Sequence, residues 1–230
     1  MNSSADMGTL AHTVMNTEIE AVVFDFGGVL TLQPLDHHLE SLRTLCGLDR
    51  SVFAAEYRRQ RRDYDRGMID SREYWSRVID SGGKPVDPGI LRSLYEEDMA
   101  CWTRINEPVL NWASQLQEAG MRTGILSNMP RDILERIESR FHWFDRFEVK
   151  IFSCELGVNK PEAEIYRACL DALQLEAEKV LFLDDVPENV RGAERAGFRT
   201  VLFRNLEDSL QEISKQGWLP VQLTADQEHG

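Results

Sequence analysis

Long apolar runs are missing from this sequence. No segment is apolar over the length needed to cross a bilayer, and residues 1–18 lack the continuous apolar stretch of a secretory signal. We therefore expect residues 1–18 to form a flexible tail. Cysteine is also scarce, and no two of the four residues Cys46, Cys101, Cys154 and Cys169 form a close pair with metal-ligand spacing. A reducing compartment suits free thiols, so a cytoplasmic location is the simplest expectation.

The sequence also has few basic residues for its acidic content. It contains 26 Lys and Arg residues against 39 Asp and Glu residues, which gives a net charge of -13. Such a surface would repel nucleic acid and anionic membranes, so neither is expected as a partner. A small anionic substrate would need cations placed locally around it. The five tryptophans suit a core or an interface equally, which leaves monomer and homodimer open.

Apolar runs bounded by turn residues predict buried strands, and amphipathic segments between the later runs predict helices. Because strand and helix alternate, the expected fold is α/β, with a doubly wound parallel sheet. The expected strands are Ala21–Phe26, Arg122–Ser127, Phe147–Phe152, Val180–Leu183 and Thr200–Phe203, and the expected core helices are Glu107–Ala119, Arg131–Phe141, Pro161–Leu173 and Pro187–Ala196.

The first two strands are separated by 95 residues, 27–121, far more than a crossover helix needs. Helical patterns at Asp36–Cys46, Ser51–Arg62, Ser71–Ile79 and Pro88–Met99 predict an all-helical cap inserted over the first strand's carboxyl end. The expected division is a core domain of residues 19–31 and 107–217, a cap domain of residues 32–106, and a C-terminal tail of residues 218–230. The arginine run Arg58, Arg59, Arg61 and Arg62 is expected on a solvated helix face rather than at a ligand.

Polar residues follow the expected strands at the sheet edge where open parallel sheets bind ligands. Asp25 ends the first strand, and Gly27 and Gly28 after it let the chain turn close to a ligand. A carboxylate there is costly to bury without a cation or donors, although the segment alone also fits an ordinary tight turn. Ser127 and Asn128 end the second strand, where a hydroxyl and free amides before a helix suit either an anion or a simple helix cap.

Charged residues at two further places complete this set. Lys160 stands in a loop, where its point charge can neutralise a phosphate or hold a carboxylate, although a lone loop lysine is typical of a surface. Asp184 and Asp185 follow an apolar strand, and adjacent carboxylates repel each other unless a hard divalent cation binds them. We expect these groups to meet Asp25 at one sheet edge.

The order and context of these residues resemble the motifs of the haloacid dehalogenase superfamily, from about Ile19 to Asn205. The motifs are an Asp after the first strand, a Ser or Thr after the second, a Lys, and a final acidic pair. The resemblance implies a Rossmann-like core. The helical insert is similar to the cap of the subgroup that contains phosphatases, phosphoglucomutases, the phosphatase domain of soluble epoxide hydrolase, and the dehalogenases themselves.

Carried over to this sequence, the resemblance implies that Asp25 is the covalent nucleophile. It further implies that Ser127 and Asn128 bind phosphate and that Lys160 is the catalytic charge anchor. Magnesium would be held by Asp25, the Gly27 carbonyl and Asp185, with Asp184 nearby or bound through water; the list of implied metal-site residues is Asp25, Gly27, Asp184 and Asp185.

Gly27 departs from the family, because its phosphatases usually carry a second Asp there as general acid and base. Activity would then rest on good leaving groups or on an acid from the cap. Cap candidates are His37, His38, Tyr64, Asp65 and Glu73, each expected at the solvated surface. Some family members with glycine at this place resemble sugar-phosphate phosphatases.

The expected function is magnesium-dependent hydrolysis of a small phosphorylated metabolite, such as a sugar phosphate, through an aspartyl-phosphate on Asp25. One alternative is a 2-haloacid dehalogenase, in which Asp25 attacks carbon and no acid is needed. The dehalogenases that this fold resembles lack the acidic pair, however, and carry an aromatic residue at the place of Gly27. The other alternative is a regulatory module that binds metal and phosphate without turnover. The physiological substrate is left open, because specificity lies in the cap.

Overall fold

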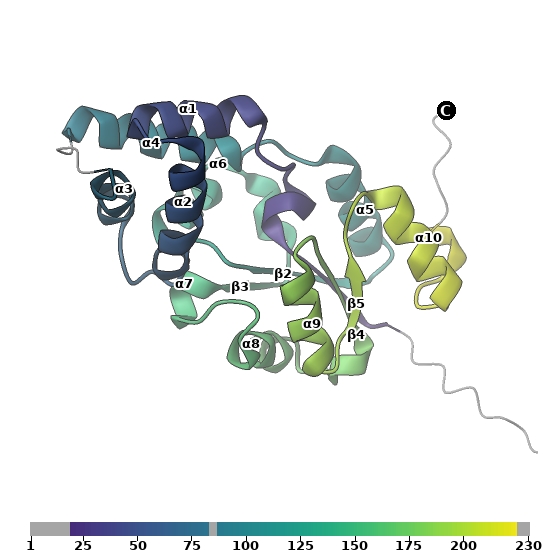
Figure 1. The fold of residues 1–230 in the computed structure, drawn as a ribbon. Coiled ribbons are helices and arrows are strands. Elements are labelled where there is room, and N and C mark those ends of the chain that lie inside the picture. Colours follow the sequence, from purple (N-terminus) through teal and green to yellow (C-terminus); the bar gives the residue numbers. More distant parts are fainter. Residues whose placement is uncertain (1–18, 83–86, 225–230) are drawn as a thin grey trace, which may run out of the picture.

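A parallel five-stranded sheet forms the centre of the computed structural model, which describes residues 19–82 and 87–224 (Figure 1). β1 (Ala21–Phe24) pairs with β2 (Arg122–Ser127) on one side and with β4 (Val180–Asp184) on the other. β3 (Val149–Phe152) and β5 (Arg199–Leu202) form the edges, so the order is β3-β2-β1-β4-β5. The predicted doubly wound α/β fold is confirmed, and its strand order reverses at β1, where such sheets bind ligands.

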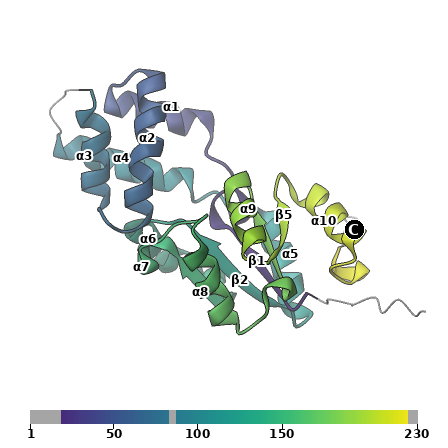
Figure 2. The ribbon, with the colours of Figure 1, turned by 60° about the horizontal axis from the view of Figure 1, so that its bottom comes forward.

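Helices cover both faces of this sheet (Figure 2). α8 (Ala163–Leu173) and α9 (Pro187–Arg195) pack on one face, and α5 (Glu107–Glu118) and α10 (Leu206–Gln216) pack on the other. Side chains alternate along a strand, so β1 contributes Val22 and Phe24 to one hydrophobic core and Ala21 and Val23 to the other. The central strand is therefore buried on both faces.

Most of the chain between β1 and α5 forms a separate layer of helices, the cap, which confirms the predicted insertion (Figure 1). Its helices are α1 (Asp36–Cys46), α2 (Arg50–Asp65), α3 (Ser71–Asp80) and α4 (Pro88–Cys101). Asp70 caps α3 by accepting a hydrogen bond from the Glu73 N–H, and Asp87 caps α4 in the same way from Gly89 and Ile90. Fully buried aromatic and aliphatic side chains fill the layer, among them Tyr64, Tyr74, Trp75 and Leu94.

The two chain segments that connect the cap to the core lie side by side. The Leu32 N–H donates to the Arg104 carbonyl at 2.8 Å, and the Asn106 N–H donates to the Leu30 carbonyl at 3.0 Å. These bonds fix where the inserted segment leaves and rejoins the core. The proposed domain limits at residues 31/32 and 106/107 fall within this pair of segments and stay predictions.

The C-terminal end of α2 is also anchored to the core. The Ser153 hydroxyl donates to the Asp65 carbonyl, and Asn159 Nδ2 donates to the Arg62 carbonyl at 2.9 Å. The Tyr64 hydroxyl donates to Asp132 at 2.8 Å. This end of α2 is therefore held over the carboxyl edge of the sheet.

Several limits differ from those predicted. β1 ends at Phe24 rather than Phe26, because the chain already turns at Asp25. Two helices were not predicted, the short α7 (Ser153–Leu156) and α10, which begins after the capping residue Asn205. The remaining core helix is α6 (Arg131–Arg140).

Residues 218–224 form no free tail, contrary to expectation. Leu219 is buried, and Trp112 Nε1 of α5 donates to the Leu223 carbonyl at 2.8 Å. Trp218, Leu219 and Leu223 pack on the core, whereas Val221 is exposed. The expected tail of residues 1–18 and residues 225–230 lie outside the described residues. Within the described ranges, no helix combines the length and apolar character that a membrane crossing requires.

Candidate active site

Asp25 lies at the carboxyl end of the central strand, where it is only 6% exposed. Its Oδ1 accepts a hydrogen bond from the Phe26 N–H at 2.6 Å. The chain then turns through Phe26–Leu30, and Gly28 adopts a φ of 80°. A Cβ at Gly28 would lie 2.7 Å from Asp185 Oδ2, so both the backbone and the available space require glycine there. The turn thus allows the carboxylates of Asp25 and Asp185 to approach each other.

Lys160 connects the carboxylates of two neighbouring strands. Its Nζ lies 2.9 Å from Asp25 Oδ1 and 2.6 Å from Asp184 Oδ2, and it donates to the Leu126 carbonyl at 2.8 Å. An ammonium group has three donors, and all three are used here. Burial lowers the pKa of Lys160, but Asp184 and Asp25 more than offset this and raise it above its ordinary value. Lys160 is therefore a fixed, permanent positive charge.

Asn128 lines the cleft and also holds the loop of Lys160. Its Oδ1 accepts from the Lys160 N–H at 2.8 Å, and its Nδ2 donates to the Lys160 carbonyl at 3.1 Å. The side-chain amide is therefore engaged by the lysine loop, and the binding of phosphate by Asn128 stays a prediction. Ser127 is 3% exposed and lines the cleft beside Asp25, and within the described residues its hydroxyl has no hydrogen-bond partner.

Asp184 and Asp185 occupy unequal environments. Asp184 is fully buried and accepts from Lys160, from the Val186 N–H at 2.8 Å and from Asn189 Nδ2 at 3.1 Å. Asp185 is half-buried, and its Oδ2 accepts from Gln33 Nε2 at 2.6 Å. Asp184 is saturated by donors, whereas Asp185 keeps an oxygen for another ligand.

The core cluster, defined as Asp25, Lys160, Asp184 and Asp185, carries excess negative charge. Ligand oxygens of its three carboxylates lie within 4.8 Å of one another. One lysine offsets one of these charges, which leaves a formal surplus of two negative charges. Burial, with smaller contributions from Asp184 and Asp185, raises the pKa of Asp25 to about 7 against the opposing effect of Lys160. Without a cation, the cluster is electrostatically strained.

A cleft of about 380 Å³ opens between this cluster and the cap. Gly27 lines it with φ -72° and ψ 124°, a conformation that any residue adopts. A Cβ there would lie 3.0 Å from Cζ3 of Trp102, whose indole covers the glycine. The ring of Trp102, rather than the backbone, therefore crowds any larger residue at the place where family phosphatases usually carry their acid, and the indole would have to shift to admit one.

The five cap residues considered as proton donors differ in their burial. Tyr64 is fully buried and Asp65 is 8% exposed, so the expectation that they lie at the solvated surface is wrong for both. His37 and Glu73 are exposed, and His38 is half-buried with its Nδ1 2.7 Å from Glu97 Oε1. Of the five candidates, Asp65 is the one that lines the cleft with Asp25.

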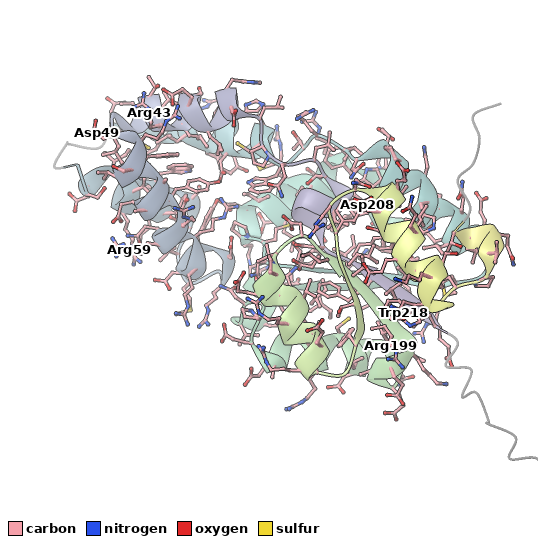
Figure 3. The ribbon with its side chains drawn as sticks, turned by 45° about the vertical axis from the view of Figure 1, so that its right-hand side comes forward. Arg43, Asp49, Arg59, Arg199, Asp208 and Trp218 are labelled. Atoms are coloured by element: carbon pink, nitrogen blue, oxygen red, sulfur yellow. The ribbon has the colours of Figure 1, made fainter. Side chains whose placement is uncertain are left out.

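The four arginines of the run have different environments, because α2 directs them to different sides. Arg59 projects from the outer side of α2 and pairs with Glu56 (Figure 3). Arg58 and Arg62 are exposed, as expected. Arg61 is not solvated, because α2 directs it into the cap: it is 17% exposed and lies between two carboxylates.

The cap cluster consists of Arg61, Asp65 and Asp98. Arg61 Nε lies 2.9 Å from Asp65 Oδ1, and its Nη1 lies 3.0 Å from Asp98 Oδ2. Burial raises the pKa of Asp65 to about 6, opposed by Arg61 and reinforced by Asp98. One guanidinium thus faces two carboxylates, and Asp65 is the member at the cleft.

Sequence reasoning missed Gln33, Asp98, Trp102 and Asn189. Asn189 follows the acidic pair by only a few residues, at the start of a helix, and this proximity was a usable signal. The other three are far from the motifs that they contact, and no local pattern connects them.

Comparison with known proteins agrees with this architecture. The family model of the haloacid dehalogenase-like hydrolases matches residues 19–197. Bifunctional epoxide hydrolase 2 of Rattus norvegicus is 33% identical over 131 residues, which is 54% of this chain, and the chain spans 23% of that relative's length. Sesquiterpene phosphatase astK of Aspergillus oryzae is 25% identical over 197 residues, covering 85% of this chain and 94% of the relative.

Two solved structures share the fold. A haloacid dehalogenase family enzyme of Bacteroides thetaiotaomicron, in complex with magnesium and inorganic phosphate, has a TM-score of 0.63 at 20% identity and covers 81% of this chain and 94% of its own. The L-2-haloacid dehalogenase of Xanthobacter autotrophicus has a TM-score of 0.59 at 21% identity, with 90% and 86% coverage. On the family match, which covers well over half of its length, the chain belongs to the haloacid dehalogenase-like hydrolases.

Proposed function

We propose that this hydrolase is a magnesium-dependent phosphatase that acts on a small phosphorylated metabolite through an aspartyl-phosphate on Asp25. The observation that carries the proposal is the core cluster, where three carboxylates share one lysine at the mouth of a cleft. A phosphatase-named relative of nearly the same length supports it, and so does a structural neighbour that holds magnesium and phosphate. For its location we keep the cytoplasm, in line with four buried, unpaired thiols.

The donor set fits a magnesium ion. Magnesium prefers one or two carboxylates, waters and substrate phosphate, and a dication would balance the surplus of two negative charges. Asp25 and Asp185 would be direct ligands with the Gly27 carbonyl. Asp184, saturated by Lys160, Val186 and Asn189, would act through water. When bound, the ion would neutralise phosphate oxygens and orient the phosphoryl group towards Asp25.

The residues of the chain then divide the reaction. Asp25 attacks phosphorus, so that an oxygen–phosphorus bond forms while the bond to the leaving oxygen breaks. Ser127 donates its free hydroxyl to the phosphoryl group. Lys160, fixed by Asn128, keeps Asp25 ionised and in position. Water then hydrolyses the aspartyl-phosphate and regenerates the carboxylate.

Asp65 is our candidate for the proton donor that Gly27 cannot supply. It lines the same cleft as Asp25, and its pKa of about 6 lies close to neutral, as a general acid requires. After giving its proton to the leaving oxygen, the Asp65 carboxylate would accept one from the attacking water. Trp102 covers Gly27, so the acid would come from the cap instead of the nucleophile's own turn.

The dehalogenase alternative gains one observation, since the indole of Trp102 places an aromatic ring over Gly27. The acidic pair opposes it, because the excess carboxylates would repel a haloacid substrate in a metal-free site. A module that binds without turnover would contain the same core cluster. These alternatives differ in product and in metal dependence rather than in geometry.

One experiment separates the three functions. Phosphate release from an aryl phosphate is measured with magnesium, with excess chelator, and with calcium, beside chloride release from 2-chloropropionate. We expect phosphate release that chelator stops, magnesium restores and calcium supports poorly, because the larger calcium shell would misplace the phosphoryl group. Chloride release that survives chelator would establish the dehalogenase instead. Phosphate binding without either product would leave only the binding module.

A further inference from the structure

Arg58 and Arg62 differ from most other arginines of the cap in having no carboxylate partner within the described residues. Paired arginines of the cap are Arg43, Arg50, Arg59, Arg61, Arg66, Arg77 and Arg92. In a chain with a net charge of -13, acidic partners are plentiful. Arg72 and Arg104 likewise have no carboxylate partner among the described residues, so what sets Arg58 and Arg62 apart is that both stand on one helix, α2.

The two arginines share a face of α2. They are four residues apart, and side chains at this spacing are neighbours on a helix surface. Both line a depression of about 450 Å³, together with Asn159 and Lys160. Two carboxylates also line it, but each is paired with another arginine, Asp65 with Arg61 and Glu162 with Arg66. The hydrogen bond from Asn159 Nδ2 to the Arg62 carbonyl holds this part of α2 in place over the core.

This depression is continuous with the catalytic cleft. Residues common to both linings are Tyr57, Arg58, Arg61, Asp65, Asn128 and Lys160. A phosphoryl group beside Ser127 would therefore leave its ester group free to extend towards Arg58 and Arg62. The charges of other nearby groups are already engaged, because Lys160 pairs with Asp25 and Asp184, and Arg61 pairs with Asp65 and Asp98.

We propose that Arg58 and Arg62 form a second anion site, and that the substrates are phosphate monoesters whose leaving group carries another anionic group, a carboxylate or a second phosphate. The inference rests on the proposed phosphatase function and specifies its substrate class. Guanidinium groups bind either oxyanion through paired hydrogen bonds. They would also draw a multiply charged substrate to a protein that otherwise repels anions.

The test compares substrates that differ only in the second anion. One pair is glycerol 1-phosphate and 3-phosphoglycerate, which introduces a carboxylate, and the other is glucose 1-phosphate and glucose 1,6-bisphosphate, which introduces a phosphate. We expect the wild-type protein to have the higher kcat/KM for the doubly anionic member of at least one pair. Arg58→Gln/Arg62→Gln should reduce that preference by about 10-fold to 100-fold, mainly through KM, as expected for charge-assisted hydrogen bonds.

The control is Arg59→Gln/Arg92→Gln, which removes two exposed positive charges of the cap that do not line the depression. It should leave the preference within about twofold, because exposed ion pairs contribute little. An equal loss in both double variants would overturn the site, since a general field effect would then explain the preference. Absence of any preference in the wild type would overturn it as well.

Binding keeps this inference separate from the phosphatase function. Calorimetric titration of the Asp25→Asn protein with both substrate pairs, in the presence of magnesium, needs no turnover. Tighter binding of a doubly anionic ligand that is lost in the added Arg58→Gln/Arg62→Gln background supports the anion site even if no phosphate is ever released. Equal binding of both members of each pair contradicts it even if the enzyme proves to be a phosphatase.

Discussion

The core cluster and the cap cluster are both buried groups in which one cation faces too many carboxylates, but the excess differs. In the core, Lys160 faces the three carboxylates of Asp25, Asp184 and Asp185, and two negative charges remain. Oxygen ligands at this spacing suit a hard divalent cation. A metal ion is the natural way to balance the core cluster.

In the cap, Arg61 faces the two carboxylates of Asp65 and Asp98, and one negative charge remains. A single proton balances it, and the pKa of about 6 at Asp65 indicates where that proton binds. In the proposed mechanism a metal ion balances the surplus of two charges in the core, whereas a proton balances the surplus of one in the cap. Both clusters border one cleft, so the account joins a metal-assisted nucleophile in the core with a proton donor in the cap.

The largest effect is expected from Asp25→Asn, which removes the nucleophile from the core cluster. The amide is nearly isosteric but is no anionic nucleophile, so kcat should fall by about 10³-fold or more. Steady-state phosphate release from an aryl phosphate measures it, with the exposed Asp171→Asn on α8 as a matched control that should retain full activity. Retention of more than about a tenth of the wild-type rate would remove Asp25 from the mechanism.

Asp65→Asn removes the proposed proton donor from the cap cluster. Alkyl phosphates, whose alkoxide departs badly without a proton, should slow about 100-fold, whereas aryl phosphates should slow by only about threefold. The acid works in its protonated form, so wild-type kcat/KM for alkyl esters should fall as the pH rises through about 6. In Asp65→Asn this decrease of kcat/KM with rising pH should disappear. An unchanged profile would show that the proton comes from elsewhere.

Asp98→Asn sharpens the same test without touching the cleft. Asp98 reinforces the raised pKa of Asp65. Its removal should therefore shift the decrease of kcat/KM to lower pH without abolishing it. The measurement is the pH dependence of kcat/KM for one alkyl phosphate in both proteins, with thermal unfolding to confirm that the buried substitution still folds. A decrease of kcat/KM at the same pH as in the wild type would show that Asp98 does not affect the titration of Asp65.

Gly27→Asp asks whether the core can regain the family's usual acid. The backbone permits a side chain there, but the Trp102 indole would have to shift to admit one, so we expect a destabilisation of about 1–3 kcal/mol from overpacking. Combining it with Trp102→Ala should recover part of that loss, because the two residues compete for one space. Denaturant unfolding of both single variants and the double variant measures the coupling. Strict additivity would mean that the contact between residues 27 and 102 has no energetic weight.

The smallest effect concerns stability in chelator. The pKa of Asp25 is raised to about 7, so the stability that its proton contributes is present below its unfolded pKa and is lost as the pH rises through about 7. Metal-free wild type should therefore be less stable than Asp25→Asn at pH 8, by roughly 1 kcal/mol or more, and the difference should shrink at pH 5. Thermal unfolding at the two pH values checks the sign. A wild type that is more stable than Asp25→Asn at pH 8 without metal would contradict the charge count.

The two clusters also differ in how well the sequence predicts them. Asp25, Ser127 and Asp184 each follow an apolar run, and parallel strands end at one edge, so their proximity follows from the fold. Lys160 stands in a loop beyond α7 rather than directly after a strand, so its place in the cluster followed from the family resemblance. The hydrogen bonds of the Asn128 side chain to the Lys160 loop were not predictable, because they join residues 32 positions apart.

The cap cluster offered no such guide. Arg61, Asp65 and Asp98 lie on helices whose rotation depends on packing, and a charged residue in a helix reads as solvated unless its partner is known. Trp102 reaches Gly27 from 75 positions along the chain, a contact that no local pattern encodes. The order of the strands predicts which residues meet at the sheet edge. Contacts made by the inserted helices can be assigned only when their tertiary packing is known.

The central claim is that Asp25 becomes phosphorylated, and trapping that species tests it most directly. The wild-type protein is mixed with an aryl phosphate and magnesium, quenched in acid within one turnover, and digested for mass spectrometry. The account predicts one added phosphoryl group on the peptide that contains Asp25, absent in Asp25→Asn and absent with chelator. Turnover without any phosphorylated peptide, or a phosphoryl group on another residue, would contradict it.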